Sequence, residues 1–418
     1  MQKTSSTSIA RAGLTLMLVV ACTSFAAAQS RRPIPRVDDP GRATSAPEEF
    51  AWDLFMATNW PAVAGRRGVP DPRRPFGPQA QAVWETWKAS TEVFLSGGAT
   101  PPGWESPDPT APGGAKTGLR LSDGVMLESS ADPSFVSGGL LDINGAPVYS
   151  EVRMNQVAFD HVVEHELYNV EGQLAYLARN EHVKMPFGAI EVKASWRILD
   201  PVKDRAIAHR YFQTDGVLRQ GTGDKRRVRL GLTGMNIMLK VMDQWFWTAF
   251  EQDDNAARTY DREFPTVMLA LRIDARMQAV NAARRARLAG SPWAHYRSNG
   301  AQIAFVGADG APTFLTNTQQ ETRILKTSSC IACHAHSAIG RPGGVPTRLF
   351  PLKTAHSDGT GTGYFGTPVA ADLRNFITLD YMWSFIEASA KAPGNTTQFL
   401  MVNGDKPPKQ GPKKPAPQ

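Results

Sequence analysis

Cysteine is scarce in this chain, with three residues among 418, at positions 22, 330 and 333. So low a count excludes a scaffold that is held together by several disulfides. Cys22 falls in a segment that we expect to be an export signal, so the other two thiols form a single pair. Because no second cysteine pair exists, this pair cannot belong to a four-cysteine structural zinc site. It must serve another chemistry.

The chain also lacks an unbroken run of about 20 apolar residues, which a membrane-spanning helix needs. Residues 1–28 have the composition of a secretory signal, because Lys3 and Arg11 precede a short apolar stretch that ends at Ala26-Ala27-Ala28. A rival processing site, Val19-Val20-Ala21-Cys22, would leave a lipid anchor on Cys22. We therefore expect a periplasmic or secreted protein without a transmembrane helix, or, as the alternative, one that is lipid-anchored at a membrane surface.

A strong charge of one sign is missing from the body of the chain. The formal net charge is +7, but residues 1–28 carry +2 and the Pro-rich tail, residues 404–418, carries +3, which leaves +2 for the rest. The composition of the tail favours a disordered basic extension. A body so close to neutral gives no indication of nucleic-acid binding.

The most informative stretch is Cys330-Ile331-Ala332-Cys333-His334. Two cysteines separated by two residues and followed at once by histidine form the attachment signature of c-type haem. Each thiol can add to one vinyl group of the porphyrin, and the imidazole of the histidine can then ligate the iron. The motif predicts one covalent haem c, attached at Cys330 and Cys333, with His334 as the proximal iron ligand.

This pentapeptide resembles the motif of the c-type cytochromes. Three further blocks, residues 191–196, 245–255 and 380–385, look like those of a bacterial group of exported proteins known only as cytochrome c family proteins. That resemblance extends over most of the chain after the signal. It implies haem binding outside the cytoplasmic membrane, but no particular reaction.

The sixth iron ligand decides what such a haem does, because a second protein ligand favours electron transfer and an open position favours ligand binding. Met382 and His356, both downstream of the motif, are the candidates that the sequence offers. An upstream residue or an open position are the alternatives. His336 follows His334 too closely to reach the opposite face of the haem.

Two classes of function therefore remain open. The first is electron transfer to or from a periplasmic redox partner protein. The second is a haem enzyme, peroxidase-like or oxygenase-like, with an open sixth position and a distal base such as His161, His165 or His356. A gas or redox sensor is a third possibility. The roughly 300 residues before the motif exceed what a simple carrier needs, yet they contain no recognisable catalytic constellation.

His161-Val162-Val163-Glu164-His165 has the H-x-x-E-H pattern of one class of zinc peptidases. Its histidines lie one helical turn apart on one face, but the sequence places no third ligand for zinc. The alternative interpretation is a pair of surface or haem-side histidines.

The patterns together predict an α+β fold, with helices packed on a β-rich centre. We expect an extended leader over residues 29–48, an α+β body over residues 49–316 and a mostly helical haem-attachment segment over residues 317–403. Alternation of apolar and polar residues predicts a half-buried strand at 190–198. The aromatic residues at 245–250 fit either a strand in the sheet core or a wall of the haem pocket.

Three helices are predicted from their spacing or composition. Residues 79–95 repeat large apolar side chains at intervals of three and four, with the tryptophans facing the core. Residues 272–288 are rich in arginine, and one or two of these guanidinium groups could pair with haem propionates. Residues 371–390 are apolar nearly all round, which predicts a buried helix.

Overall fold

The computed structural model describes the following residues of the chain: 34–107, 116, 120–121, 141–180, 182–220, 224–257, 273–319, 328–335, 337–340, 355–356, 364–365 and 376–391. The predicted signal at 1–28 and the predicted tail at 404–418 lie outside this description. Among the residues described, no helix is both long enough and apolar enough to cross a membrane.

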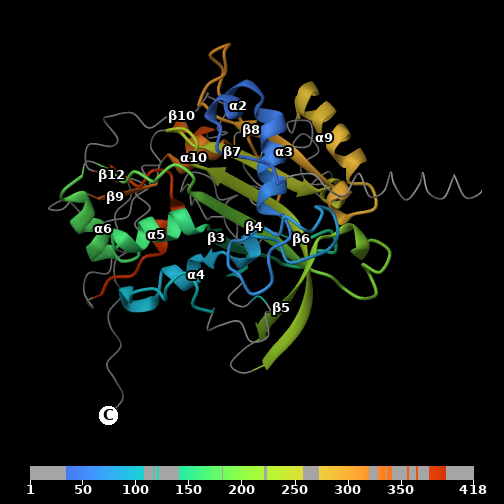
Figure 1. Cartoon of the computed structure of the whole chain (residues 1–418), viewed down its shortest axis with the longest axis horizontal. Coiled ribbons are helices and arrows are strands. Elements are labelled where there is room, and N and C mark those ends of the chain that lie inside the picture. The colour runs from blue at the N-terminus through green and yellow to red at the C-terminus, as the bar shows by residue number, and fades with distance from the viewer. Residues whose placement is uncertain are drawn as a thin grey trace, which may run out of the picture.

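One large antiparallel sheet forms the centre of the molecule (Figure 1). Its strands follow the order β1-β3-β4-β6-β7-β8, with β2 paired to β3 and β5 paired to β6. Helices pack on this sheet, which confirms the predicted α+β class. The strands are β1 (Lys88–Ala89), β2 (Arg120–Leu121), β3 (Val148–Met154), β4 (Ile190–Ile198), β5 (Gln213–Gln220), β6 (Asp224–Leu239), β7 (Phe246–Gln252) and β8 (Tyr296–Gln302).

The remaining elements are short. Two small antiparallel pairs join β9 (Ala338–Gly340) to β12 (Phe376–Thr378) and β10 (Ala355–His356) to β11 (Tyr364–Phe365). The α-helices are α2 (Pro40–Ser45), α3 (Pro47–Thr58), α4 (Ser90–Val93), α5 (Gln156–Glu164), α6 (Val170–Leu177), α9 (Ala275–Arg287) and α10 (Cys330–His334). Single 3-10 turns are found at Trp84–Thr86, Ser96–Gly98, Ala208–Arg210, Asp253–Ala257, Pro292–His295 and Trp383–Glu387.

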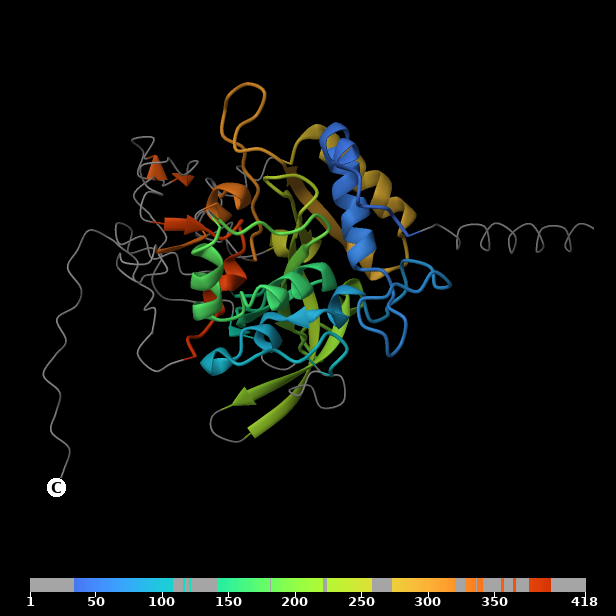
Figure 2. The same cartoon turned by 60° about the vertical axis from the view of Figure 1, so that its left-hand side comes forward.

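One face of the sheet is apolar, and α3 and α9 pack against it (Figure 2). On this face Phe250 of β7 stacks on Phe55 of α3, with ring centroids 4.0 Å apart, and meets the edge of Trp52 at 5.0 Å. The indole of Trp52 donates to Asn281 of α9 at 2.8 Å. Each of these large side chains gains about 1.5–3 kcal/mol from burial, so this face anchors the N-terminal helix to the sheet.

The opposite face carries polar side chains and is covered by the C-terminal elements, which lie on the other side of the sheet from α3 and α9 (Figure 2). The Ser384 hydroxyl donates to the Glu191 carboxylate at 2.6 Å, and Ser195 donates to the carbonyl of Gln319 at 3.4 Å. Glu191 is only 5% exposed and Ser195 is 0% exposed. The strand predicted at 190–198 is confirmed as β4, but it is buried on both faces, because residues far along the chain cover the polar one.

The helix predicted at 79–95 is wrong. The chain makes a 3-10 turn, then β1, then α4, because Lys88 and Ala89 pair with β3. The Glu92 carboxylate accepts from the amide of Ala89 at 2.9 Å and fixes the start of α4. Trp84 and Trp87 are nevertheless buried, as their predicted place in the core requires.

The prediction of a mostly helical segment over 317–403 is also wrong for the residues that the structure describes there. In place of the helix at 371–390, β12 pairs with β9 and a 3-10 turn follows at Trp383–Glu387. Asp380 and Tyr381, with φ of 49° and 69°, take left-handed backbone angles that interrupt any helix. Apolar composition alone therefore misidentified this stretch.

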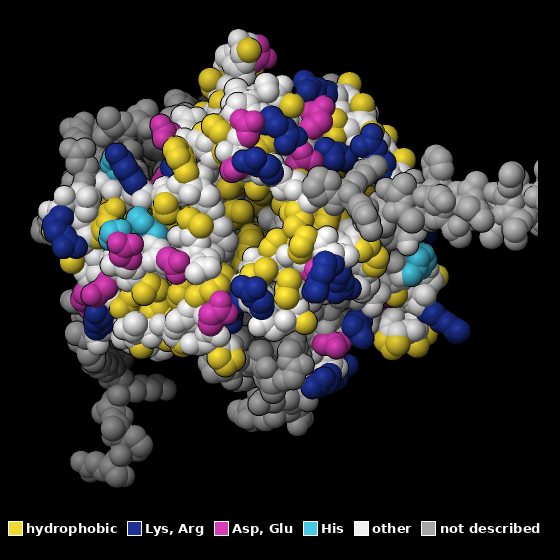
Figure 3. All heavy atoms as spheres, viewed as in Figure 1, with side chains coloured by type: hydrophobic (Ala, Val, Ile, Leu, Met, Phe, Trp, Pro, Cys, Tyr) yellow, Lys and Arg dark blue, Asp and Glu magenta, His cyan; other side chains and the backbone are white. Residues whose placement is uncertain are grey.

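The extended leader predicted over 29–48 contains the helix α2. The carboxylate of Asp39 caps it by accepting from the amides of Gly41 at 2.9 Å and Arg42 at 3.2 Å, and Pro40 takes the first helical position. Charges of both signs lie interspersed over the upper part of the face seen in Figure 3. Arg276 of α9 pairs with Glu48 of α3 at 3.1 Å. The leader is thus part of the helical layer.

Candidate functional site

The short helix α10 carries the two cysteines and the histidine of the motif, and its start is fixed to the end of β8. Ser329 caps the helix by accepting from the amide of Ala332 at 3.3 Å. The side chain of Gln302, the last residue of β8, accepts from the amide of Ile331 at 3.0 Å and donates to the Ser329 hydroxyl at 2.8 Å. Gln302 is 2% exposed, so these contacts replace water and hold the motif in one place on the sheet.

Cys330 and Cys333 do not form a disulfide. Their spacing of three residues on a helix places both thiols on one side of it. The Cys330 thiol is buried and lies 3.5 Å from the carbonyl oxygen of Leu315, whereas Cys333 is partly exposed. Two thiols on one side of a helix are what attachment to two neighbouring vinyl groups requires.

His334 is held in one tautomer. Its Nδ1 lies 2.7 Å from the carbonyl oxygen of Tyr381, and a carbonyl only accepts, so Nδ1 carries the proton and Nε2 carries the lone pair. Burial lowers the pKa of His334 to about 3; the Tyr381 carbonyl acts against this shift and the charge of Lys193 adds to it. The imidazole is therefore neutral, which is the form that ligates a metal.

Two indoles flank the His334 ring. Trp247 of β7 lies 4.7 Å from it between ring centroids, and Trp383 meets it edge-on at 6.2 Å. The strand interpretation of the aromatic residues at 245–250 is confirmed, because β7 is a strand buried along its whole length. The haem-pocket interpretation stays a prediction, although one ring of β7 reaches the motif histidine. Trp247 belongs to the polar face of the sheet, which the C-terminal elements cover.

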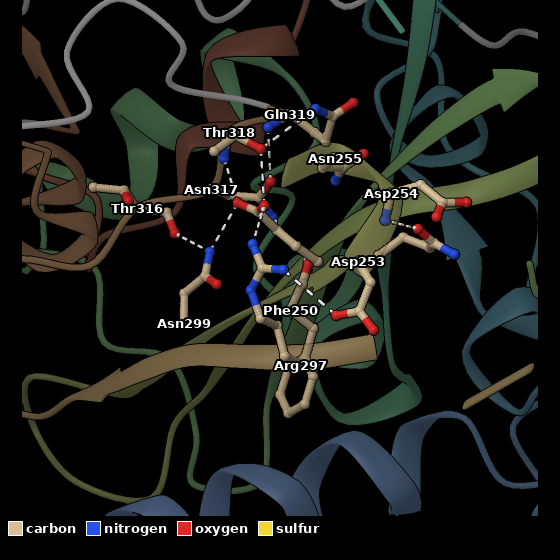
Figure 4. Close-up of polar contacts among 12 residues, drawn as sticks. Phe250, Asp253, Asp254, Asn255, Arg297, Asn299, Thr316, Asn317, Thr318 and Gln319 are labelled. Atoms are coloured by element: carbon tan, nitrogen blue, oxygen red, sulfur yellow. Dashed lines mark hydrogen bonds and ion pairs between the residues drawn. The ribbon is translucent and has the colours of Figure 1, made fainter. Parts of the chain in front are cut away.

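A second anchor lies before the motif, where the segment 316–319 crosses the polar face (Figure 4). The carboxylate of Glu251, which is 0% exposed, accepts from the Thr318 amide, from the Thr318 hydroxyl at 2.8 Å and from the Asn299 side chain at 2.8 Å. Asn317 donates to Asn236 of β6 at 2.9 Å. The description of this segment ends at Gln319, and residues 320–327 lie outside it.

Glycine is required at position 234 of β6, beside this anchor. A Cβ atom there would lie 2.8 Å from the Asn317 Oδ1 atom, which itself accepts from the amide of Gln319 at 2.9 Å. The missing side chain lets the segment 316–319 approach the sheet backbone closely. Gln302 therefore ties the motif itself to the sheet, and the segment 316–319 ties down the chain that leads to it.

A cavity of about 630 Å³ opens beside the motif, within the range of small-molecule sites. Ala335 and Tyr381, the neighbours of His334, contribute to its wall together with the end of β6 and the segment before β4. Its lining mixes aromatic and charged side chains: His182, Lys184, Phe187, Lys240, Asp243, Phe305, Asp380 and Tyr381.

Met382 stays a sixth ligand that is predicted from the sequence alone. It is fully buried in the core and directly follows Tyr381, whose carbonyl contacts the Nδ1 side of His334. An iron bound by His334 would lie on the opposite, Nε2 side. His356 is in β10, but its side chain lies outside the description, as does all of His336.

His161 and His165 form a pair on α5, with ring centroids 4.5 Å apart. The Nε2 atom of His161 is buried and has no hydrogen-bond partner among the residues described. Burial and the neighbouring His165 lower the pKa of His161 to about 4. Within the described part of the chain, no group of three or more His, Cys, Asp or Glu side chains could hold a metal ion, so the H-x-x-E-H pattern gains no third ligand there.

Two arginines of the helix predicted at 272–288, confirmed as α9, pair with carboxylates of the protein. Arg284 pairs with Asp53 of α3 at 2.9 Å, and Arg285 pairs with Asp253. Because α9 packs on the apolar face, these groups are on the other side of the sheet from Cys330.

Glu191 is a buried carboxyl group beneath the C-terminal elements. Burial raises its pKa to about 7, the Ser384 hydroxyl opposes this shift, and the nearby Glu387 adds to it. Because the folded protein then binds a proton that the unfolded chain releases above about pH 4.5, the free energy of unfolding falls as the pH rises from about 4.5 to 7. Glu191 accounts for a decrease of about 3 kcal/mol in the free energy of unfolding over this pH range.

Urea unfolding at pH 5 and pH 8 measures this dependence. We expect Glu191→Gln to reduce the difference between the two pH values, whereas Glu105→Gln, at an exposed side chain, keeps it. An equal difference in wild type and Glu191→Gln would show that Glu191 does not titrate in this range.

No family model matches the chain, and no curated protein and no solved structure is significantly similar to it. The resemblance to the c-type cytochromes thus remains a prediction from the sequence. The residues that sequence reasoning missed, Gln302, Glu251 and Tyr381, are brought to the motif by contacts with distant parts of the chain.

Proposed function

We propose that this protein is an exported monohaem protein similar to the c-type cytochromes, which binds haem covalently through Cys330 and Cys333 and transfers electrons to or from a periplasmic partner protein. The observation that carries the proposal is the hydrogen bond from His334 Nδ1 to the carbonyl of Tyr381. That bond leaves Nε2 as the donor atom and fixes the ring in the orientation of a proximal ligand.

The side chains of the motif suit a covalently attached haem. Two thiols that are not joined in a disulfide can form the two thioether bonds, and the neutral imidazole of His334 can ligate the iron. The indoles of Trp247 and Trp383 pack beside the imidazole. The haem, when bound, supplies a one-electron couple, and the tethers at Gln302 and Glu251 hold its attachment site on the sheet.

A haem enzyme of peroxidase-like or oxygenase-like chemistry is the second candidate. The cavity of about 630 Å³ beside the motif favours it, because Ala335 and Tyr381 line this cavity and it has room for an exogenous ligand. Met382 and His356 remain the candidates for a sixth protein ligand in the electron-transfer proposal.

The visible spectrum of the purified protein, oxidised and reduced, with and without carbon monoxide, separates the two candidates. Electron transfer predicts sharp low-spin bands that do not change with the gas, because two protein ligands occupy the iron. A high-spin spectrum that shifts on addition of carbon monoxide would instead establish an open position and favour the enzyme. A preparation without haem bands would contradict both.

A further inference from the structure

The carbonyl that contacts His334 belongs to a strained segment. Asp380 and Tyr381 are consecutive non-glycine residues with φ of 49° and 69°. Left-handed backbone angles are unfavourable in such residues and persist only where the surroundings enforce them. The strain turns the Tyr381 carbonyl towards Nδ1 of His334, 2.7 Å away.

Three donors hold the side chain of Asp380 in place. Lys240, which directly follows β6, donates at 2.9 Å, the indole of Trp245 at 3.2 Å and the backbone amide of Met185 at 2.7 Å. Asp380 is 9% exposed, Lys240 is 6% exposed and Trp245 is 0% exposed, so water does not compete for these bonds. We call this set of four residues, Asp380, Lys240, Trp245 and Met185, the Asp380 clamp.

The lysine is itself fixed, which makes the clamp rigid. Its Nζ atom donates to the carbonyl of Asp243 at 2.8 Å and lies 5.5 Å from the ring centroid of Trp245. Lys240, Asp243, Asp380 and Tyr381 also form part of the wall of the 630 Å³ cavity. The clamp therefore joins the end of β6 to the loop that contacts the motif histidine.

We propose that the Asp380 clamp positions His334 and sets the redox potential of the haem; this inference rests on the proposed function. By holding the Tyr381 carbonyl on Nδ1, the clamp keeps the hydrogen bond short and makes the imidazole a stronger electron donor to the iron. A stronger donor stabilises ferric over ferrous iron and lowers the potential. Covalent attachment through Cys330 and Cys333 does not depend on it.

The test compares midpoint potentials of the full-length protein in Asp380→Asn, Lys240→Met and Ser384→Ala. Each of the first two breaks the clamp, and we expect each to shift the ferric–ferrous equilibrium about tenfold towards ferrous iron, which is ~59 mV for one electron. Ser384→Ala is the matched control, because it removes a bond from the same C-terminal segment to Glu191 and leaves the clamp intact.

The two clamp variants also separate positioning from a simple charge effect. Loss of the Asp380 charge raises the potential and loss of the Lys240 charge lowers it if only the charges act, whereas loss of positioning raises the potential in both. Opposite shifts would overturn the inference, as would an equal shift in Ser384→Ala. Trp245→Phe removes the hydrogen bond from the indole to Asp380 without changing any charge. It takes the place of Asp380→Asn or Lys240→Met if either of those variants does not fold, and we expect it too to raise the potential.

A haem stain of each denatured protein distinguishes the two proposals. Stained wild type with unchanged potentials in the clamp variants refutes the positioning role alone. Unstained wild type refutes the proposed function, and the clamp inference with it.

Discussion

If the proposed function holds, we expect replacement of Cys330 and Cys333 together with alanine to abolish covalent haem binding. The reason is chemical: the thioether bonds need both thiols, and the chain has only one further cysteine. A haem stain after denaturing gel electrophoresis measures the effect, because only covalently bound haem survives denaturation. The expected result is complete loss of staining in the double variant.

Cys22→Ala is the matched control for this experiment. It removes the remaining cysteine, which lies in the predicted signal. We expect the exported Cys22→Ala protein to stain for haem as the wild type does. Staining that persists in the double variant would refute the assignment of Cys330 and Cys333 as the sites of haem attachment.

Glu251→Ala lowers the free energy of unfolding by about 3–5 kcal/mol. Glu251 is 0% exposed, and its carboxylate accepts from Thr318 and Asn299 and lies 3.6 Å from the guanidinium of Arg297. Removing it leaves the buried Thr318 hydroxyl without this acceptor and leaves Arg297 paired with Asp253 alone. Urea unfolding at pH 7 measures the change.

Asp253→Ala serves as the comparison. Asp253 also pairs with Arg297, at 3.5 Å, but its side chain is 29% exposed, so we expect a loss of no more than about 1 kcal/mol. Similar losses in both variants would mean that the segment 316–319 does not depend on the buried carboxylate.

Sequence reasoning was reliable where the cause of structure is local. The alternation at 190–198 predicted β4, and the composition at 272–288 predicted α9. It failed where pairing between strands decides the local structure. Strand β1 interrupts the helix that was predicted at 79–95, because Lys88 and Ala89 pair with β3. At 371–390 the apolar pattern carried no sign of the left-handed angles at Asp380 and Tyr381.

The candidate site divides in the same way. The motif itself was evident, because its residues are adjacent in sequence. Its supports were not, since Tyr381 is 47 positions from His334 and Gln302 is 29 positions from Ile331. The block at 380–385 was noticed for its resemblance to exported cytochrome c family proteins, but nothing local indicates that Asp380 orients a carbonyl.

The two covered faces of the sheet have a thermodynamic consequence. Since the C-terminal elements shield Glu191, Ser195 and Glu251 from water, their detachment exposes one whole side of β4, β6 and β7. Detachment of the C-terminal elements that carry the motif and unfolding of the sheet are then coupled in one equilibrium rather than separate events. Any group that binds the motif only while these elements are packed on the sheet adds its binding free energy to the stability of strands that it never touches.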